Sequence, residues 1–157
     1  MMIRVEPLEN HPELVPLCAR WNFEEWGQSA GRTMEETVEG FLGFLDPSSG
    51  QKAFVGFASG LPVGVALLID NDLESHAHLK PWLASLYVMP EMRGQGVGKA
   101  LIGATENSAR NLGHTQLYLY TSEPDYYRPL GWQDFETLTG DDAGLVILAR
   151  SLIRLSS

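Results

Sequence analysis

The spacing of apolar and polar positions predicts that strands and helices alternate along the whole chain. Apolar residues recur at helical spacing in two segments near the N-terminus. One is capped by Asn10 and runs to Trp21, and the other is opened by the capping box Thr33–Glu36. Further helices are expected over Val97–Leu112 and about Pro124–Arg128. Strands are expected at Ile3–Pro7, Ala53–Ala58, Pro62–Ile69, Leu83–Met89, Gln116–Thr121, Trp132–Leu138 and Gly144–Ala149.

The predicted order of elements is therefore β-α-α-β-β-β-α-β-α-β-β, with the tight turn Ser59-Gly60 joining a hairpin. The segment Gln116–Thr121 has apolar residues on both faces, which predicts a strand that is buried on both sides. No repeat, linker or low-complexity segment interrupts this order. We therefore expect a single domain over residues 1–157.

Composition and charge narrow the class of protein. Cys18 is the only cysteine, which excludes an internal disulfide and a cysteine-rich metal site. The N-terminus lacks the pattern of a signal peptide, and apolar runs such as Pro62–Ile69 are too short to span a bilayer. We expect a cytoplasmic protein with no membrane partner. The net charge of −9, without any basic run, argues against a nucleic-acid partner.

A glycine-rich loop, Arg93–Lys99, lies between the strand expected at Leu83–Met89 and the helix that follows it. Three alternate glycines leave backbone N–H groups unshielded, and the helix N-terminus adds its positive dipole end. This is a cradle for a phosphate-bearing ligand. A P-loop would need a glycine where Arg93 stands and a serine or threonine at Ala100, and the G-x-G-x-G spacing differs from the dinucleotide-binding G-x-G-x-x-G.

Two motifs resemble those of the GNAT superfamily of N-acetyltransferases. Residues Val88–Leu101 match V-x-P-x-x-R-G-x-G-x-G-x-x-L, and Tyr126–Trp132 is similar to F-Y-x-x-L-G-F. Their order along the chain and the expected elements between them agree with this family. The resemblance implies an α/β (α+β) fold in which helices flank a mixed, mostly antiparallel central sheet. It also implies acetyl-CoA as co-substrate and an amine on a small molecule or a peptide as acceptor.

The resemblance also implies roles for individual residues. Backbone N–H groups of the loop would bind the cofactor pyrophosphate, and the pantetheine arm would run along the strand before the loop as an added strand does. The implied cofactor-binding residues are Leu86, Tyr87, Val88, Arg93, Gly94, Gln95, Gly96, Val97, Gly98 and Lys99.

Tyr127 matches the family's catalytic tyrosine, which assists the leaving CoA thiolate. Because the pKa of tyrosine, about 10, exceeds that of a thiol, about 8.5, we expect Tyr127 to act mainly as a hydrogen-bond donor. Helical geometry separates adjacent side chains by about 100°. We therefore expect Tyr126 and Leu130 to share the core face and Tyr127 to point away from it.

The general base stays open at the level of sequence. Some family members carry a glutamate on the strand before the loop, where this chain has Ala84 and Ser85. The family often has asparagine and alanine before the tyrosine, where this chain has Tyr120 and Glu123. The candidate bases are Glu24, Glu25, Asp70, Asp72, His76, His78 and Glu123. His76 and His78 also form a weak metal pair, but no third ligand stands at a suitable spacing, and we expect no metal.

Acceptor recognition in this superfamily usually involves the first two helices, their connection and the last strands. In this chain, that directs attention to residues 21–32 and 70–81. Candidate substrate residues are Glu24, Trp26, Asp70 and His78. An opening lined by the carboxylates of Glu24 and Glu25 and by the ring of Trp26 would suit a cationic amine. The alternatives are an acyl-CoA sensor without catalysis, transfer of another acyl group, and transfer to a hydroxyl. The oligomeric state stays open, and a homodimer through sheet edges or terminal strands would be unsurprising in this superfamily.

Overall fold

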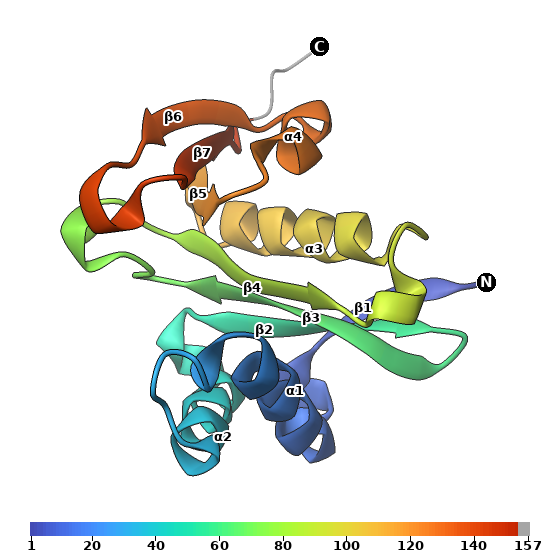
Figure 1. Cartoon of the computed structure of the whole chain (residues 1–157). Helices are drawn as coiled ribbons and strands as arrows, with labels where there is room; N and C mark the ends of the chain where they lie inside the picture. Colours follow the sequence, from blue (N-terminus) through green and yellow to red (C-terminus); the bar gives the residue numbers. More distant parts are fainter. Residues whose placement is uncertain (154–157) are drawn as a thin grey trace.

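The chain forms one seven-stranded sheet in a computed structural model that describes residues 1–153 (Figure 1). The strand order is β1-β2-β3-β4-β5-β7-β6, and every neighbouring pair is antiparallel except β4 and β5. The expected fold class, a mixed and mostly antiparallel sheet flanked by helices, is confirmed. The strands are β1 (Ile3–Pro7), β2 (Lys52–Ala58), β3 (Leu61–Ile69), β4 (Trp82–Val88), β5 (Gln116–Thr121), β6 (Gln133–Thr137) and β7 (Val146–Ser151).

Helices cover both faces of the sheet. On one face lies α3 (Val97–Asn111), and on the other lie α1 (Val15–Asn22) and α2 (Met34–Leu42) (Figure 1). The short α4 (Pro124–Tyr127) follows β5. Each face has its own large cluster of buried apolar side chains, and a third, smaller cluster forms around Trp82 of β4 and Ile147 of β7. Within residues 1–153, none of the helices combines the length and the apolar character that crossing a bilayer requires.

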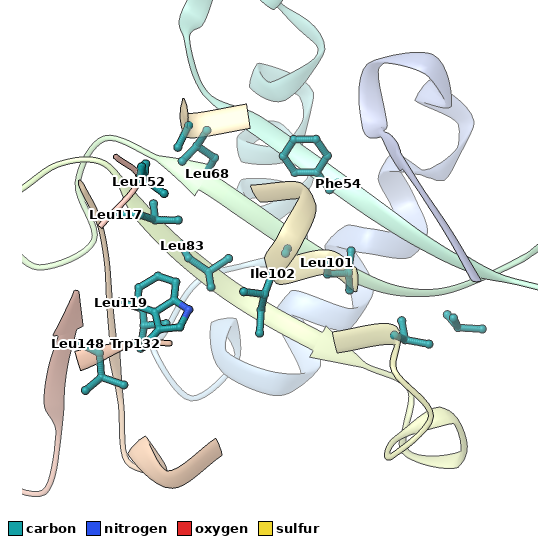
Figure 2. Packing of buried hydrophobic residues seen from close by; sticks show 14 of the residues in the cluster. Phe54, Leu68, Leu83, Leu101, Ile102, Leu117, Leu119, Trp132, Leu148 and Leu152 are labelled. Atoms are coloured by element: carbon teal, nitrogen blue, oxygen red, sulfur yellow. The ribbon is translucent and has the colours of Figure 1, made fainter. Parts of the chain in front are cut away.

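The helix α3 packs closely on the sheet. Figure 2 shows Leu101 and Ile102 of α3 gathered with Leu83 of β4 and other buried side chains of the strands. A glycine of β3 makes room for this contact, because a Cβ atom at Gly64 would lie 2.7 Å from the carbonyl oxygen of Tyr87 and 3.1 Å from Leu101 Cδ1. The first turn of α3 is thereby held against β3 and β4.

Most elements expected from the sequence are present at nearly the expected bounds, and those of β1 and β5 agree at both ends. The capping box that opens α2 is also confirmed. Thr33 Oγ1 accepts a hydrogen bond from the Glu36 N–H at 3.1 Å, and the Thr33 N–H donates to Glu36 Oε1 at 2.8 Å. Local patterns that need no distant partner are therefore the ones that the sequence predicts best.

The predicted N-cap of the first helix is wrong. Asn10 ends a 3₁₀ turn, a second 3₁₀ turn covers Pro12–Leu14, and α1 begins only at Val15. Pro16 explains the late start, because its ring would clash with the carbonyl four residues earlier inside a helix and is tolerated only in the first turn. At its other end, α1 continues into a π-helical turn, Phe23–Gly27.

The sheet opens between its two central strands. The parallel pairing of β4 with β5 consists of Trp82 opposite Tyr118, and beyond this point the strands diverge (Figure 1). The last two strands form the antiparallel pair expected from the sequence, but β7 lies between β5 and β6. The first turn of α3 and the end of α4 both border this open region.

Candidate active site

Two adjoining cavities occupy the region where β4 and β5 separate. Their volumes are about 630 and about 650 Å³. The first extends toward the glycine loop, and the second extends toward the π-helical turn and the segment between β3 and β4. The residues that line both cavities are Glu25, Leu86, Thr121, Glu123 and Tyr127. A ligand bound in one cavity would therefore contact a ligand bound in the other at these residues.

The glycine loop forms one wall of the first cavity, and its backbone conformation explains the glycines. Gly94 and Gly96 have φ angles of 77° and 96°, in the left-handed region that favours glycine, and Gly96 is the N-cap of α3. A Cβ atom at Gly98 would lie 2.5 Å from Tyr126 Oη. The Tyr126 hydroxyl therefore lies directly against the first turn of α3, and any side chain at position 98 would collide with it.

This wall fits a diphosphate. Unshielded N–H groups at the start of a 15-residue helix combine hydrogen-bond donors with the positive end of the helix dipole. Arg93 and Lys99 also line the cavity and add positive charge. Arg93 is held in place because its Nε donates to the Val88 carbonyl at 2.9 Å and its guanidinium lies 5.8 Å from the centre of the Tyr87 ring.

The predicted cofactor residues are nearly all at this cavity. Within the described part of the chain, eight of the ten line it, and Gln95 and Val97 do not. The Val97 side chain is buried beneath α3 in the core. The roles proposed for these two residues depend on their backbone N–H groups.

Tyr127 projects from the end of α4 toward both cavities. Its ring packs edge-on against Tyr126, with centroids 4.9 Å apart, and against Trp132, with centroids 6.3 Å apart. Burial, together with the neighbouring Tyr126 and Glu123, raises the pKa of Tyr127 to about 12. The hydroxyl is therefore protonated at neutral pH and available as a hydrogen-bond donor.

The predicted orientations of the two tyrosines are reversed. Tyr126 is 47% exposed and reaches Gly98, whereas Tyr127 packs against the apolar core together with Leu130. The expectation assumed one continuous α-helix through Leu130. Instead α4 ends at Tyr127, and a 3₁₀ turn containing Pro129 follows, so residues three apart share a face.

The second cavity contains one carboxyl group with unusual acid–base behaviour. Burial raises the pKa of Asp72 to about 7, against the opposing effect of the Arg32 guanidinium. Burial also raises the pKa of Tyr120, and the Asp72 charge adds to this effect. Trp26, which the sequence suggested as a substrate residue, lines the same cavity.

Three other predicted substrate residues lie elsewhere. Within the described residues, Glu24, Asp70 and His78 are absent from the lining of either cavity, although Glu25 lines both. The exposed Asp70 follows β3, where its N–H donates to Gln51 Oε1 at 2.9 Å. The ring of His78 stacks on His76, with centroids 5.8 Å apart.

His76 is also outside both cavities, because its Nε2 pairs with Glu136 Oε2 of β6 at 2.9 Å. Of the candidate bases, only Glu25, Asp72 and Glu123 line a cavity. Among residues 1–153, no three His, Cys, Asp or Glu side chains come together as a metal site, and metal-free chemistry stays a prediction.

Some lining residues carried no signal in the sequence. Leu145 belongs to an unremarkable loop pattern, and Tyr120 stood out only as a departure from the family's asparagine; folding brings both to the second cavity. Arg32 fell inside the segment expected to recognise the acceptor, but nothing distinguished it from its neighbours. Tyr126 belonged to a motif, yet its contact with Gly98 depends on how α4 sits against α3.

Comparison with known proteins identifies the family. The sequence profile of the acetyltransferase (GNAT) family matches residues 6–132, which is most of the chain. The chain belongs to the acetyltransferase (GNAT) family. It is accordingly an N-acetyltransferase that uses acetyl-CoA. No curated protein matches this GNAT acetyltransferase at a significant level.

Solved structures with similar folds include aminoglycoside acetyltransferases. An aminoglycoside 6′-acetyltransferase type Ii is 18% identical, with a TM-score of 0.75 over 99% of this chain and 100% of that one. An aminoglycoside 6′-N-acetyltransferase complexed with coenzyme A is 16% identical, with a TM-score of 0.75 over the full length of both chains. The corresponding enzyme from Enterococcus faecium is 16% identical, with a TM-score of 0.74 and the same coverage. At these identities the likeness establishes the fold of this GNAT acetyltransferase.

Proposed function

We propose that this enzyme transfers an acetyl group to a cationic amine that occupies the second cavity. The observation that carries the proposal is the meeting of the two cavities at Tyr127, next to the glycine loop. One cavity has the donors for a diphosphate, and the other has carboxylates for an ammonium group. Direct attack of the amine on the acetyl thioester requires this arrangement, because both reactants must be bound at the same time.

The cofactor half of the site would be formed by main chain. N–H groups of Arg93–Lys99 would bind the pyrophosphate, and Leu86–Val88 would accompany the pantetheine arm. When bound there, acetyl-CoA supplies an acetyl group as a thioester. Each interaction with the helix terminus contributes about 0.3–1 kcal/mol, and up to about 2 kcal/mol when partly buried.

Asp72 is our candidate for the general base. A lysine-like amine has a pKa of about 10.4, so an ordinary aspartate at about 3.9 would accept its proton at a cost of roughly 9 kcal/mol. The pKa of Asp72, about 7, reduces this cost to roughly 5 kcal/mol. Glu25 and Glu123 also line the cavity, and we assign to their carboxylates the role of attracting the ammonium group.

Tyr127 is our candidate for the residue that assists the leaving group. Its pKa of about 12 lies above that of a free thiol, about 8.5, so complete proton transfer to a thiolate is uphill. A hydrogen bond from its hydroxyl to the developing negative charge requires no such transfer. Because this charge develops during the reaction, the bond would lower the barrier more than it strengthens cofactor binding.

The acceptor class follows from charge. Three carboxylates and one guanidinium line the second cavity, and the chain has a net charge of −9. Both features attract a cationic acceptor. Aminoglycosides, which the three structural neighbours act on by name, are amines of this class and are the first acceptors to test.

The test measures CoA release with a panel of aminoglycosides, polyamines and lysine peptides. Tyr127→Phe should lower kcat by about 10²–10³-fold, as loss of one such hydrogen bond typically does, while CoA binding is unchanged. Tyr126→Phe is the comparison variant: its hydroxyl lies at the first turn of α3 in the first cavity, so any effect should fall on CoA binding and leave kcat at saturating acetyl-CoA unchanged.

An unchanged kcat in Tyr127→Phe would contradict the role of this tyrosine. Tight CoA binding without turnover of any amine would instead favour an acyl-CoA sensor. Propionyl-CoA and succinyl-CoA, tested with the same acceptors, would reveal a preference for another acyl group.

A further inference from the structure

The strand β4 carries a bulge at Ser85. Its ladder with β3 is regular up to Ala84 and again from Tyr87, while β3 contributes only one residue between the partners of these two. Ser85 has a φ angle of 52°, in the left-handed region where a residue with a Cβ atom pays an energetic cost. In the G1 type of bulge, glycine takes this left-handed conformation. Another contact must therefore hold the serine there.

The bulge decides which way the cofactor-facing half of β4 is turned. Before it, Leu83 contacts the core on the α3 side and Ala84 contacts the core on the other side. After it, Leu86 and Val88 contact the α3 side and Tyr87 contacts the other side. In a regular strand these three residues would each face the opposite side, because side chains alternate. The bulge therefore decides which side chains of β4 line the first cavity, because it shifts the alternation of side chains by one residue.

A buried asparagine provides the contact. Asn22, at the end of α1, is 6% exposed, and its Nδ2 donates to Ser85 Oγ at 3.1 Å. Its Oδ1 accepts from Arg32 Nη2 at 3.3 Å. Both ends of the amide are thus engaged, so its orientation is fixed, and the pairing avoids the cost of an unsatisfied buried amide.

The hydrogen bonds that link Arg32, Asn22 and Ser85 also connect the two halves of the site. Ser85 and Arg32 line the second cavity, and Leu86, the next residue of β4, lines both cavities. Asn22 itself lines neither of them. It therefore acts through its neighbours and not by touching a reactant.

We propose that Asn22 is a positioning residue for the cofactor. Its hydrogen bond to Ser85 holds the bulge of β4, and Arg32 orients the Asn22 amide. This inference rests on the proposed binding of CoA along Leu86–Val88.

Two substitutions at Ser85 provide the sharpest test, with binding of CoA measured by calorimetry. Ser85→Ala keeps the Cβ atom and removes the hydroxyl, and we expect the Kd for CoA to rise about tenfold, which corresponds to about 1.4 kcal/mol. Ser85→Gly also removes the hydroxyl but takes the left-handed conformation freely. We expect its Kd to stay within about twofold of wild type, a change of about 0.4 kcal/mol.

Asn22→Ala should weaken CoA binding as much as Ser85→Ala does. The double variant Asn22→Ala with Ser85→Gly should bind CoA with nearly wild-type affinity. Thr37→Val is the matched control in the same helical layer. Thr37 is 5% exposed on α2, and its Oγ1 donates to the Thr33 carbonyl at 2.9 Å. We expect this variant to bind CoA as wild type does.

Equal CoA affinity of Ser85→Ala and Ser85→Gly would overturn the inference, and so would failure of Ser85→Gly to restore binding in Asn22→Ala. If Asn22→Ala does not fold, the pair at Ser85 decides alone, because α1 is unchanged in both variants. Wild-type protein that does not bind CoA would instead overturn the proposed function, and the inference with it.

Discussion

Asp70 and Asp72 show how surroundings decide the chemistry of a side chain. They are two residues apart, yet Asp70 is exposed beside Gln51 and Asp72 lies in the wall of the second cavity. Burial raises the pKa of Asp72 to about 7, and Arg32 opposes that rise. Its carboxyl group therefore titrates within the pH range in which an acetyltransferase would be assayed, and its charge controls the rate if it is the base.

Asp72→Asn should lower kcat/KM by about 10²–10⁴-fold, the usual contribution of a general base. In wild-type enzyme, kcat/KM should rise with pH through an apparent pKa of about 7, because only the ionised carboxylate accepts a proton. The variant should lose this step. Asp70→Asn is the control and should keep the wild-type profile. A wild-type profile in Asp72→Asn would exclude Asp72 as the base.

The same substitution should affect stability in a pH-dependent way. The folded-state pKa of Asp72, about 7, lies above the unfolded value of about 3.9, so the folded protein binds more protons between these pH values. Wild-type stability should therefore fall as pH rises from about 4 to 7. Asn cannot ionise, so thermal unfolding should show Asp72→Asn gaining stability relative to wild type across this window.

At the scale of elements, the contact between α3 and the sheet determines where the glycine loop lies. The loop is a local feature that the sequence predicts, but its position against β4 depends on glycines in other strands. Gly56 and Gly64 each leave space in which a Cβ atom would approach Val97 or Leu101 of α3 to 3.0–3.1 Å. These two glycines allow the first turn of α3 to lie close to the sheet.

Gly64→Ala should therefore destabilise the protein by about 1–3 kcal/mol, the usual cost of inserting a methyl group into a packed core. The added Cβ atom would meet the backbone oxygen of Tyr87 at 2.7 Å, and backbone cannot move aside easily. Gly103→Ala on α3 is the matched control. Its Cβ atom would meet nothing within 4 Å, so helix propensity should stabilise the protein by about 0.5–1 kcal/mol. Urea unfolding measures both, and equal stability of the two variants would contradict the packing argument.

At the scale of the whole molecule, the proposed cationic acceptor and the anionic CoA carry opposite charges, and both meet a chain of net charge −9. Long-range attraction favours a cationic acceptor and disfavours CoA, which depends on the local donors of the glycine loop and on Arg93 and Lys99. Salt screens the long-range part, with a Debye length of about 10 Å at 0.1 M and about 3 Å at 1 M.

Raising the salt concentration should therefore increase KM for a polycationic acceptor several-fold, as estimated from this screening. The KM for an uncharged hydroxylamine-type acceptor should stay nearly constant. Initial rates with both acceptors at saturating acetyl-CoA would measure the difference. An acceptor KM that is independent of salt would argue against a cationic substrate.

The sequence by itself determined the features that depend on neighbours along the chain. The order of elements, the capping box of α2 and the glycine loop at the start of α3 are set by local backbone preferences and by the period of apolar positions. These also carry the family resemblance. The same local reasoning failed at Asn10, because Pro16 delays the start of α1, and at Tyr126, because a 3₁₀ turn containing Pro129 follows α4.

Only the tertiary structure decided which side chains share the site. Asp72, Arg32 and Tyr120 come from separate parts of the chain, and they meet because β4 diverges from β5 beyond Trp82. The pKa of Asp72 and the left-handed backbone of Ser85 likewise depend on what packs against them. Burial and contacts between distant segments do not exist until the chain folds, so no local pattern encodes them.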